Sequence, residues 1–365
     1  MKNTFGNSVA VTLFGESHGE YIGAVIDGLA SGITIDREYI SHQLTLRRPS
    51  GKISTPRAEK DEFKIVSGVL NDKSTGTPIT ILIPNENVKS GDYSQIKTIA
   101  RPSHADYTAE CKYHGFQDYR GGGHFSGRIT AALVAAGAIC KFALEEKGIY
   151  IGTHVKRCAT VQDRNFEDIF ADIKSINQKS FAVFEESAGE KMKEAILAAS
   201  ADGDSVGGVL ETAILGMPLG VGEPWFDTME GMLSHMMFSI PAVKGIEFGA
   251  GFAISDMRGS KANDPFRMEN GKVITETNNT GGINGGITNG MPIIFRTAIK
   301  PTPTIFKPQN TVNFQTMTEV VSEPKGRHDP AIVHRARVVQ DAATAIVLCD
   351  SLALRFGTDW LTPTI

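Results

Sequence analysis

Short runs of β-branched residues, broken by glycine or proline, are the feature that most constrains the fold of this chain. Six runs are typical of β-strands and five segments have helical periodicity. We expect strands at residues 8–14, 22–27, 63–69, 79–84, 206–215 and 292–299, and helices at residues 36–48, 128–146, 191–200, 227–237 and 337–356. The two kinds of element do not alternate strictly, as they would in a doubly wound sheet. The pattern therefore predicts an α/β fold, a layered α/β sandwich with antiparallel sheets around helices.

Two segments share the same rhythm of glycine, strand, acidic residue and glycine. They are GAVIDGLASG at residues 23–32 and GGVLETAILGMPLG at residues 207–220. The repetition raises an internal duplication as an interpretation of the two halves. Because no proline-rich or serine-rich linker divides the chain, we expect one domain over residues 1–365.

Charge and cysteine usage narrow the classes of partner. A formal net charge of −4 gives no reason to expect nucleic acid or an anionic membrane as the main partner. The four cysteines are widely spaced and form no CxxC pair, so neither a disulfide framework nor a zinc site is indicated, and we expect no metal. The N-terminus lacks the pattern of a signal peptide, and the most apolar stretch, residues 129–144, contains Lys141 and favours a buried helix. A reducing cytoplasm fits these features.

Glycine is the composition outlier, and its clustering points to a binding site. The chain has 38 glycines in 365 residues, above the usual share of about 7%. One cluster, RGGGHFSGRIT at residues 120–130, lies directly before an apolar helical segment. Its glycines permit close backbone approach, Ser126 could cap the helix, and the free N–H groups of a helix start favour an anion. We expect a phosphate or carboxylate here, although a structural glycine turn explains the same pattern.

Three other motifs in the first part of the chain carry polar or charged side chains that could bind a ligand. The motif GESHG places Ser17 and His18 at the end of a strand, where they could face a ligand or simply form a turn. The motif RPSHADYT holds Arg101 and His104 on a proline-stiffened loop, which is either an anion site with a proton donor or a solvated loop. Arg47 and Arg48, with Lys52 close behind, could form a lid for a polyanion or an ordinary basic helix end.

Two motifs near the C-terminus complete the set. Doubled glycines at residues 281–290 are followed by the rigid run KPTPT at residues 300–304, which could accommodate a flat ring and a phosphate. The run GRHDP at residues 326–330 precedes the last helix, where Asp329 could act on a ligand or cap the helix.

In this order, the motifs GESHG, RPSHADYT, YRGGGHFSGRIT, GGINGGI, KPTPT and GRHDP closely resemble the chorismate synthase family. The resemblance runs from residue 4 to the C-terminal helix. It implies a carbon–oxygen lyase of the shikimate pathway and of aromatic amino acid biosynthesis. The expected reaction is a 1,4-anti elimination of phosphate from 5-enolpyruvylshikimate 3-phosphate, giving chorismate with reduced FMN as cofactor and no net redox change.

The resemblance also implies roles for individual residues. His18, supported by Ser17, corresponds to the general acid for the leaving phosphate, and His104 to the histidine that acts on the reduced flavin. Asp329 would assist proton removal. The implied substrate-binding residues are Arg47, Arg48, Lys52, Arg101, Ser126 and Arg128.

The implied flavin contacts include three departures from the commonest family pattern. They are His124 and Phe125, where Arg-Ser is frequent, and Pro241, where asparagine is common. Lys52 likewise stands where arginine is usual. The full implied cofactor set is His124, Phe125, Ser126, Pro241, Ala242, Gly285, Lys300, Pro301, Thr302, Pro303, Thr304 and Arg327.

The resemblance further implies a homotetramer, with either NADPH or a separate flavin reductase supplying electrons to the flavin. Two other functions remain open on the residues alone. A flavin-dependent oxidoreductase would use the same glycines, although the chain has no GxGxxG nicotinamide fingerprint. A non-catalytic anion-binding module would use the same arginine loops, although RNA-binding modules are usually basic and rich in stacking aromatics.

Overall fold

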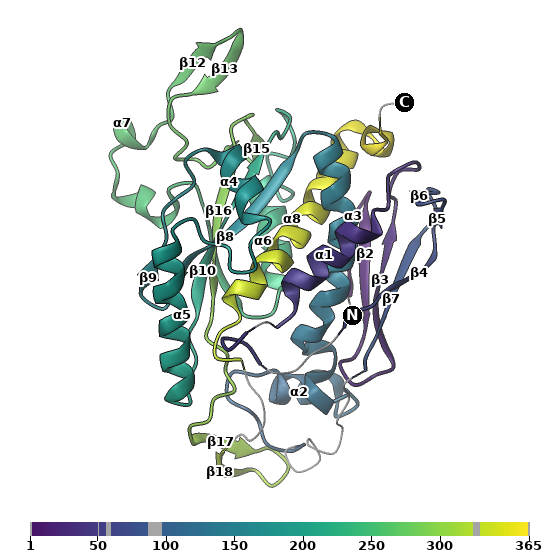
Figure 1. Ribbon diagram of the computed structural model, residues 1–365, viewed down its shortest axis with the longest axis vertical. Coiled ribbons are helices and arrows are strands. Elements are labelled where there is room, and N and C mark those ends of the chain that lie inside the picture. The colour runs from purple at the N-terminus through teal and green to yellow at the C-terminus, as the bar shows by residue number, and fades with distance from the viewer. Residues whose placement is uncertain (1, 50, 56–59, 87–96, 324–328, 364–365) are drawn as a thin grey trace.

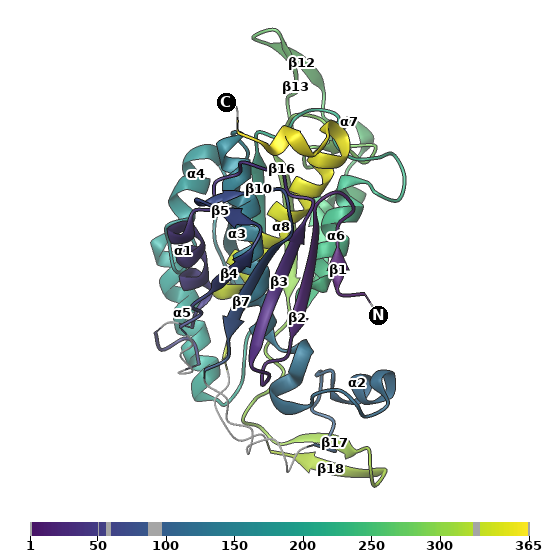
Figure 2. The same cartoon turned by 90° about the vertical axis from the view of Figure 1, so that its right-hand side faces the viewer.

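Two antiparallel five-stranded sheets enclose a layer of helices in the computed structural model, which describes residues 2–49, 51–55, 60–86, 97–323 and 329–363 (Figures 1 and 2). The first sheet consists, in order, of β1 (Thr4–Phe5), β2 (Ala10–Gly15), β3 (Tyr21–Asp27), β7 (Ile79–Pro84) and β4 (Lys64–Ser67). The second consists of β11 (Val243–Phe248), β16 (Ile293–Ile299), β10 (Gly208–Leu215), β8 (Tyr150–Cys158) and β9 (Val161–Gln162). The expected α/β sandwich with antiparallel sheets around helices is confirmed.

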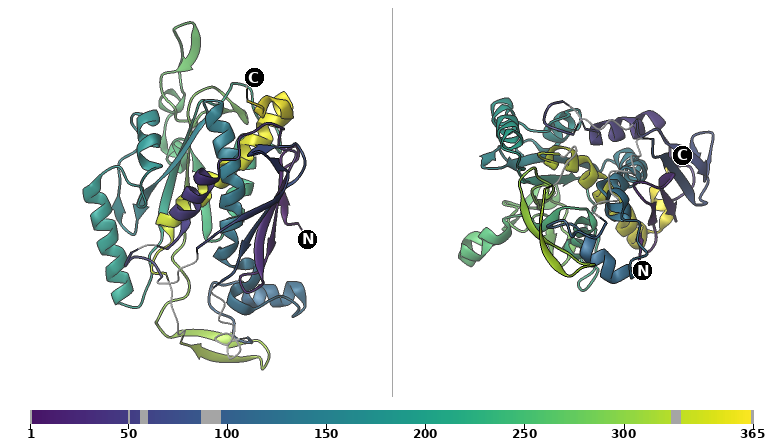
Figure 3. Two further views of the ribbon diagram at one scale, coloured as in Figure 1. Left: turned by 45° about the vertical axis from the view of Figure 1, so that its right-hand side comes forward. Right: turned by 90° about the horizontal axis from the view of Figure 1, so that it is seen from below.

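The layer between the sheets consists of helices that differ in length and polarity. They are α1 (Arg37–Arg47), α3 (Thr130–Glu146), α6 (Met229–Ser239) and α8 (Val333–Phe356). Helix α3 contacts β3 and β7 of the first sheet, α8 contacts β8 and β10 of the second, and the two helices pack on each other (Figure 3). At their crossing Gly137 faces the Ala342 carbonyl so closely that a Cβ would clash with it. The helix layer is therefore packed through small side chains.

The burial of α3 explains its composition. A helix that is apolar on all sides is typical either of a protein core or of a membrane span. Within the described residues one helical stretch, Gly127–Glu146, is long and apolar enough to cross a membrane, and 83% of its most apolar window is buried inside the protein. The predicted buried helix is confirmed.

One buried ion pair joins the helix layer to the second sheet. Lys141 Nζ on α3 donates to Asp341 Oδ2 on α8 at 2.8 Å, and both side chains are almost completely shielded from solvent. The other oxygen of Asp341 accepts from Thr153 Oγ1 on β8 at 2.6 Å. A buried charge is tolerated when it is paired and its remaining lone pairs are hydrogen-bonded. These contacts fix α8 against both of its neighbours.

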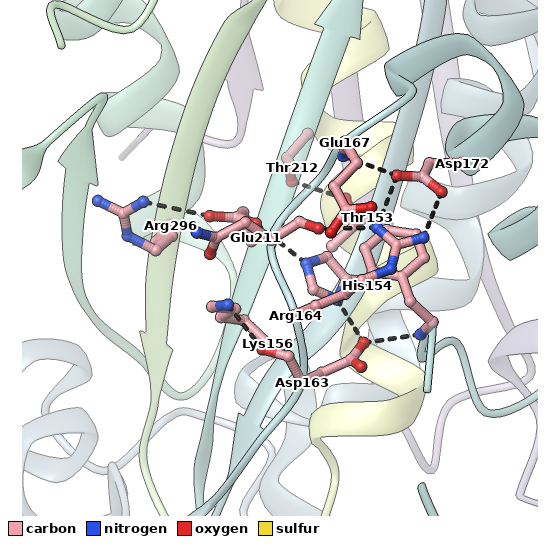
Figure 4. A network of polar contacts seen from close by, with 12 residues as sticks. Thr153, His154, Lys156, Asp163, Arg164, Glu167, Asp172, Glu211, Thr212 and Arg296 are labelled. Atoms are coloured by element: carbon pink, nitrogen blue, oxygen red, sulfur yellow. Dashed lines mark hydrogen bonds and ion pairs between the residues drawn. The ribbon is translucent and has the colours of Figure 1, made fainter. Parts of the chain in front are cut away.

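A polar network on the second sheet lies outside this helix layer (Figure 4). The ring nitrogens of His154 contact Asp163 Oδ2 and Glu211 Oε2, each at 3.1 Å. Arg296 Nη1 donates to the other oxygen of Glu211 at 3.1 Å. Burial alone would raise the pKa of Glu211, but hydrogen bonds from His154 and Arg296 hold it below its usual value. Asp163 also accepts from the backbone N–H groups before α5 (Glu186–Ala201) and so ties that helix to the sheet.

The remaining elements of the described residues are short helices and two-stranded hairpins. The short helices are α2 (Asp106–Tyr113), α4 (Ile169–Ile176), α7 (Gly259–Ala262), η2 (Arg120–Phe125), η3 (Gly127–Ile129), η4 (Gly251–Asp256) and η5 (Thr358–Leu361). The hairpins are β5–β6 (Val69–Leu70 and Lys73–Ser74), β12–β13 (Phe266–Glu269 and Lys272–Thr275), β14–β15 (Ile283–Asn284 and Ile287–Thr288) and β17–β18 (Gln309–Asn313 and Thr318–Ser322). Figure 1 shows β12–β13 projecting at one end and β17–β18 lying at the other.

All six predicted strands and five predicted helices are present, with ends displaced by a few residues. Gly148 follows α3 in a left-handed conformation, which is typical of a glycine just past a helix end. The sequence patterns missed β8, β11, α2, α4 and the small hairpins. The two glycine-flanked segments form β3 and β10, which occupy the central position of their respective sheets. This equivalent placement supports the duplication hypothesis.

Replacing Asp341 by asparagine should lower the free energy of unfolding by about 3 kcal/mol or more, because Lys141 would keep a buried, unpaired charge. Urea unfolding followed by circular dichroism measures the change. The matched control is Asp72→Asn, which breaks the solvent-exposed ion pair with Arg37 and should change stability by less than about 1 kcal/mol. If the two variants lost equal free energy of unfolding, the buried pair would contribute no more to stability than the exposed one.

Candidate active site

A cavity of about 900 Å³ opens at the end of the sandwich where α1 ends and α3 and α8 begin. Its walls also include α2, η2, the end of α6 and the start of β11. Among the described residues, eight cationic side chains line it: Lys2, Arg47, Lys97, Arg101, Arg128, Lys244, Lys300 and Arg335. The carboxylates among the same described lining residues are three: Asp106, Asp118 and Asp329. In a chain of net charge −4 this excess of cations marks a site for anions.

Asp61 organises the arginine end of the cavity. Its side chain is fully buried, and its two oxygens contact Arg47 Nη1 at 3.1 Å, Arg48 Nε at 3.7 Å, and Arg128 Nη1. The three arginines come from the end of α1, the loop after it, and η3. Within the described residues one carboxylate faces three guanidiniums, so this part of the cluster keeps a net positive charge next to the cavity.

Further hydrogen bonds hold two of these guanidiniums in place. Arg128 donates through Nε to Asn85 Oδ1 and through Nη2 to the Pro84 carbonyl, both at 3.0 Å. Arg47 donates through Nε to Thr130 Oγ1 at 3.1 Å. Burial lowers the pKa of Arg47 to about 10 despite the attraction of Asp61. The Arg47 side chain therefore stays cationic at neutral pH. A second anion beside it would offset the free-energy cost of burying this charge.

The glycine turn of η2 covers His18. Gly121, Gly122 and Gly123 all have positive φ, and a Cβ at Gly121 would clash with the imidazole ring of His18. Ser17 donates its backbone N–H to the Gly123 carbonyl at 3.1 Å. Both Ser17 and His18 are buried, directly behind the part of η2 that lines the cavity. Glycine at 121 is thus required for this close approach.

The loop before α2 carries the second predicted histidine. His104 lines the cavity, and its Nε2 contacts Thr304 Oγ1 at 2.6 Å. Arg101 also lines the cavity, but its guanidinium forms two hydrogen bonds with Asp106, at 2.8 and 2.7 Å. Burial alone would raise the pKa of Asp106, and the bonds from Arg101 outweigh it and lower the pKa. Arg101 therefore has a carboxylate partner within the protein and offers less charge to a ligand than Arg47 or Arg128.

Asp329 joins the loop after α1 to the first turn of α8. Its Oδ1 accepts from the Thr55 backbone N–H at 2.9 Å, and its Oδ2 accepts from Arg335 Nη2 at 2.6 Å. Its alternative interpretation as a helix cap is wrong, because α8 begins after Ile332 with no side-chain cap. Beside it Ser54 Oγ contacts Nε2 of the buried His334 at 2.9 Å. The end of the basic loop is thus attached to α8 at two successive residues.

The structure brings most of the implied cofactor contacts into this cavity. His124, Phe125, Ser126, Pro241, Ala242, Lys300 and Pro303 all line it. Ser126 accepts from the Arg128 N–H at 3.2 Å and so caps η3, the short turn that leads directly into α3.

Other expected site residues lie elsewhere. Four expected residues are neighbours in sequence of residues that line the cavity but do not line it themselves: Arg48, Pro301, Thr302 and Thr304. Lys52 is exposed. Gly285 lies in the exposed turn of the β14–β15 hairpin, away from the cavity. Arg327 lies outside the described residues. Within the parts of the chain that are described, no three His, Cys, Asp or Glu side chains are grouped to hold a metal ion.

Sequence reasoning missed Asp61 and Arg335. Asp61 stands in the charged stretch KDEFK, where nothing local separates it from a solvated carboxylate. Arg335 belongs to the run HRAR after the GRHDP motif, and an arginine in the first turn of an apolar helix was the only available signal. The arginines of the site can bind a polyanion, and the buried His18 and the half-buried His104 lie beside the place where it would bind.

Replacing Asp61 by asparagine should lower the free energy of unfolding by about 3 kcal/mol or more, because three arginines would lose their shared counterion. Inorganic phosphate should then stabilise the variant more than the wild type, since the cluster holds one more uncompensated cation. Urea unfolding with and without phosphate, at constant ionic strength, measures both effects.

Asp341→Asn is the matched control, because it also removes a fully buried carboxylate but lies in the core. Its response to phosphate should equal that of the wild type. The same phosphate response in all three proteins would contradict an anion-binding arginine cluster.

Comparison with known proteins agrees with the geometry. The chorismate synthase family model matches residues 9–353. Chorismate synthase from Thermococcus gammatolerans is 46% identical over 352 residues, covering 96% of this chain and 97% of the relative. The enzyme from Dehalococcoides mccartyi is 46% identical over 360 residues, covering 98% of both chains. A crystal structure of chorismate synthase superposes with a TM-score of 0.76 at 30% identity, covering 97% of this chain and 94% of that one. This chain belongs to the chorismate synthase family and is therefore a carbon–oxygen lyase.

Proposed function

We propose that this protein converts 5-enolpyruvylshikimate 3-phosphate to chorismate by eliminating phosphate in the presence of reduced FMN. The observation that carries the proposal is one cavity of about 900 Å³ that is lined by Arg47, Arg128, the η2 glycine turn and His104, with His18 buried directly behind that turn. This volume lies near the upper end of the range for ligand pockets, about 300–1,000 Å³. It is large enough for a substrate and a flat cofactor together.

The substrate carries two carboxylates and a phosphate, and the arginine end of the cavity suits such a ligand. Guanidiniums bind planar carboxylates and phosphates through pairs of parallel N–H donors. Arg47 and Arg128 are fixed by Asp61 and by their other hydrogen bonds, so they lose little freedom when an anion binds. Arg335 lies at the same end and extends the cationic surface.

His18 is our candidate for the acid that protonates the leaving phosphate. Ser17 Oγ lies 3.2 Å from the Arg120 carbonyl, which can only accept, so the Ser17 hydroxyl proton points to that carbonyl. The hydroxyl oxygen must then accept from His18 Nδ1, also at 3.2 Å. With Nδ1 protonated in this way, His18 has a second proton to give only as the imidazolium, from Nε2. Ser17 therefore sets the orientation of His18 and the nitrogen that acts.

His104 and Asp329 stand at other points of the wall. The contact of His104 Nε2 with Thr304 orients the ring on the side of the KPTPT segment, where we place the flavin. Asp329 is held by Thr55 and Arg335 at the arginine end. We propose that His104 assists protonation at the flavin and that Asp329 assists proton removal from the substrate.

The residues present fit a flavin. Apolar residues of the cavity wall, including Leu13, Leu133, Met236 and Ile240, supply a surface for a flat ring. The η2 turn has no side chains on three successive residues, so a planar group can approach its backbone. When bound, reduced FMN would supply the electron chemistry that the protein's own side chains lack. The chain's part is to orient substrate, exclude water and deliver protons.

We also propose a homotetramer, in which the projecting β12–β13 hairpin would be covered. Phe266, Met268 and Val273 of this hairpin are large and exposed, which is typical of an interaction surface.

The proposed compartment is the cytoplasm, where the four cysteines, none of them in a disulfide, stay reduced. One core cluster joins both halves of the chain and supports a single domain. Electrons for the flavin would come from NADPH or from a separate reductase.

Anaerobic incubation with 5-enolpyruvylshikimate 3-phosphate and dithionite-reduced FMN tests the reaction. We expect equal amounts of chorismate and phosphate, and no product when the FMN is oxidised. Net consumption of reduced flavin would favour an oxidoreductase, and ligand binding without product would favour an anion-binding module.

Replacing His18 by alanine should lower kcat by about 10²-fold or more, since general acids act in the transition state. The dissociation constant of the substrate should change little. His42→Ala is the control, because His42 is exposed on α1 and should be silent. If His18→Ala raises KM and leaves kcat unchanged, His18 binds substrate and its role as an acid is refuted.

A further inference from the structure

Asn85 lies between two parts of the site that come from different elements of the fold. It follows β7 directly and is half-buried. Its backbone N–H donates to the Glu20 carbonyl at 3.1 Å, which extends the antiparallel pairing of β3 with β7 by one residue. The end of β7 therefore lies beside the turn between β2 and β3, and this turn carries Ser17 and His18.

The side-chain amide of Asn85 holds both ends of this turn. The Gly19 N–H donates to the Glu16 carbonyl at 3.0 Å and closes a β-turn. Ser17 and His18 are the two central residues of that turn. Asn85 Nδ2 donates to the Glu16 carbonyl at 3.0 Å and to the Gly19 carbonyl at 2.8 Å. Both protons of the amide are thus bound to backbone groups that flank the two central residues.

The oxygen of the same amide contacts the arginine cluster. Arg128 Nε donates to Asn85 Oδ1 at 3.0 Å, and the Arg128 side chain is almost completely buried. A guanidinium can only donate and a backbone carbonyl can only accept, so these partners determine which end of the amide is oxygen and which is nitrogen. An aspartate in place of Asn85 could accept from Arg128 but could not donate to the turn.

We infer that Asn85 is a positioning residue that fixes His18 relative to Arg128. This inference rests on the proposed function, in which Arg128 binds an anionic group of the substrate and His18 protonates the leaving phosphate. A proton donor must lie within hydrogen-bond distance of its acceptor, and a displacement of about 1 Å can lower the rate about 10²-fold. One amide therefore sets the distance between the group that binds the anion and the group that reacts with it.

The imidazole of His18 reports this role in the protein without ligands. The measurement is an NMR spectrum of protein labelled with ¹³C at the histidine Cε1, in which the His18 signal is identified by its loss in His18→Ala. Asn85→Ala should shift the His18 signal, because the turn loses two hydrogen bonds. The matched control is Asn177→Asp. Asn177 is also half-buried and donates its amide to a backbone carbonyl, that of Ile151 at 3.0 Å, but it lies outside the cavity.

The anaerobic assay gives a second readout. Asn85→Ala should lower kcat roughly tenfold or more, whereas Asn177→Asp should leave it unchanged. In a double-mutant cycle the effect of Asn85→Ala should largely vanish in the His18→Ala background, because Asn85 acts through a side chain that is already absent. Asn85→Asp keeps the acceptor for Arg128 and should show the same dependence on His18. It carries both measurements if Asn85→Ala does not fold.

Two results would overturn the positioning role. One is a His18 signal that shifts no more in the Asn85 variant than in Asn177→Asp. The other is an equal fall in kcat with and without His18, which is the result expected if Asn85 only stabilises the fold. A wild type that makes no chorismate would contradict the proposed function instead, and the His18 signal would still show whether Asn85 holds the turn.

Discussion

The buried carboxylate of Asp61 is the constraint on which the site depends. Three guanidiniums from α1, the following loop and η3 meet around it, those of Arg47 and Arg128 almost completely buried, and such charges cannot be buried together without a counterion. Asp61 supplies it from a backbone in the left-handed region, with φ of 53°. Because its charge is only −1, the cluster is held together and yet remains cationic. The same contact therefore stabilises the fold and leaves positive charge that can bind an anion.

The histidine part of the site depends on backbone, in contrast to the arginine part. His18 lies directly under η2, where a side chain at Gly121 could not be accommodated. The Ser17 hydroxyl and the Arg120 carbonyl then fix the ring. The glycine triplet that seemed from the sequence to be only an anion loop therefore has a second function, which is to allow the strand end at residues 15–19 to approach the start of α3.

Features of this protein that depend on neighbouring residues could be predicted from the sequence, whereas features that depend on residues distant in the chain could not. Strands such as Ile79–Pro84 and helices such as α3 were found because their periodicity is local. The motifs at His18, His104 and Asp329 were found through resemblance. Asp61 and Arg335 were missed because their importance comes from the partners that the fold brings to them, which no local pattern marks. The pairing of Arg101 with Asp106 lies within one motif, but the geometry that neutralises the arginine could not be read from spacing.

Helix α8 connects the core to the site and explains why polar groups are kept in the helix layer. Its 24 residues span about 36 Å, from the first turn at the cavity to the far end of the sandwich. An apolar helix interface alone would leave its rotation and register weakly specified. Asp341 lies about two turns after Arg335 on α8. Its ion pair with Lys141 and the hydrogen bond that it accepts from Thr153 fix the rotation and the register of the helix. Arg335, and Asp329 through it, therefore take their positions in the cavity from a contact in the core, so that the core pair contributes to the precision of the site as well as to stability.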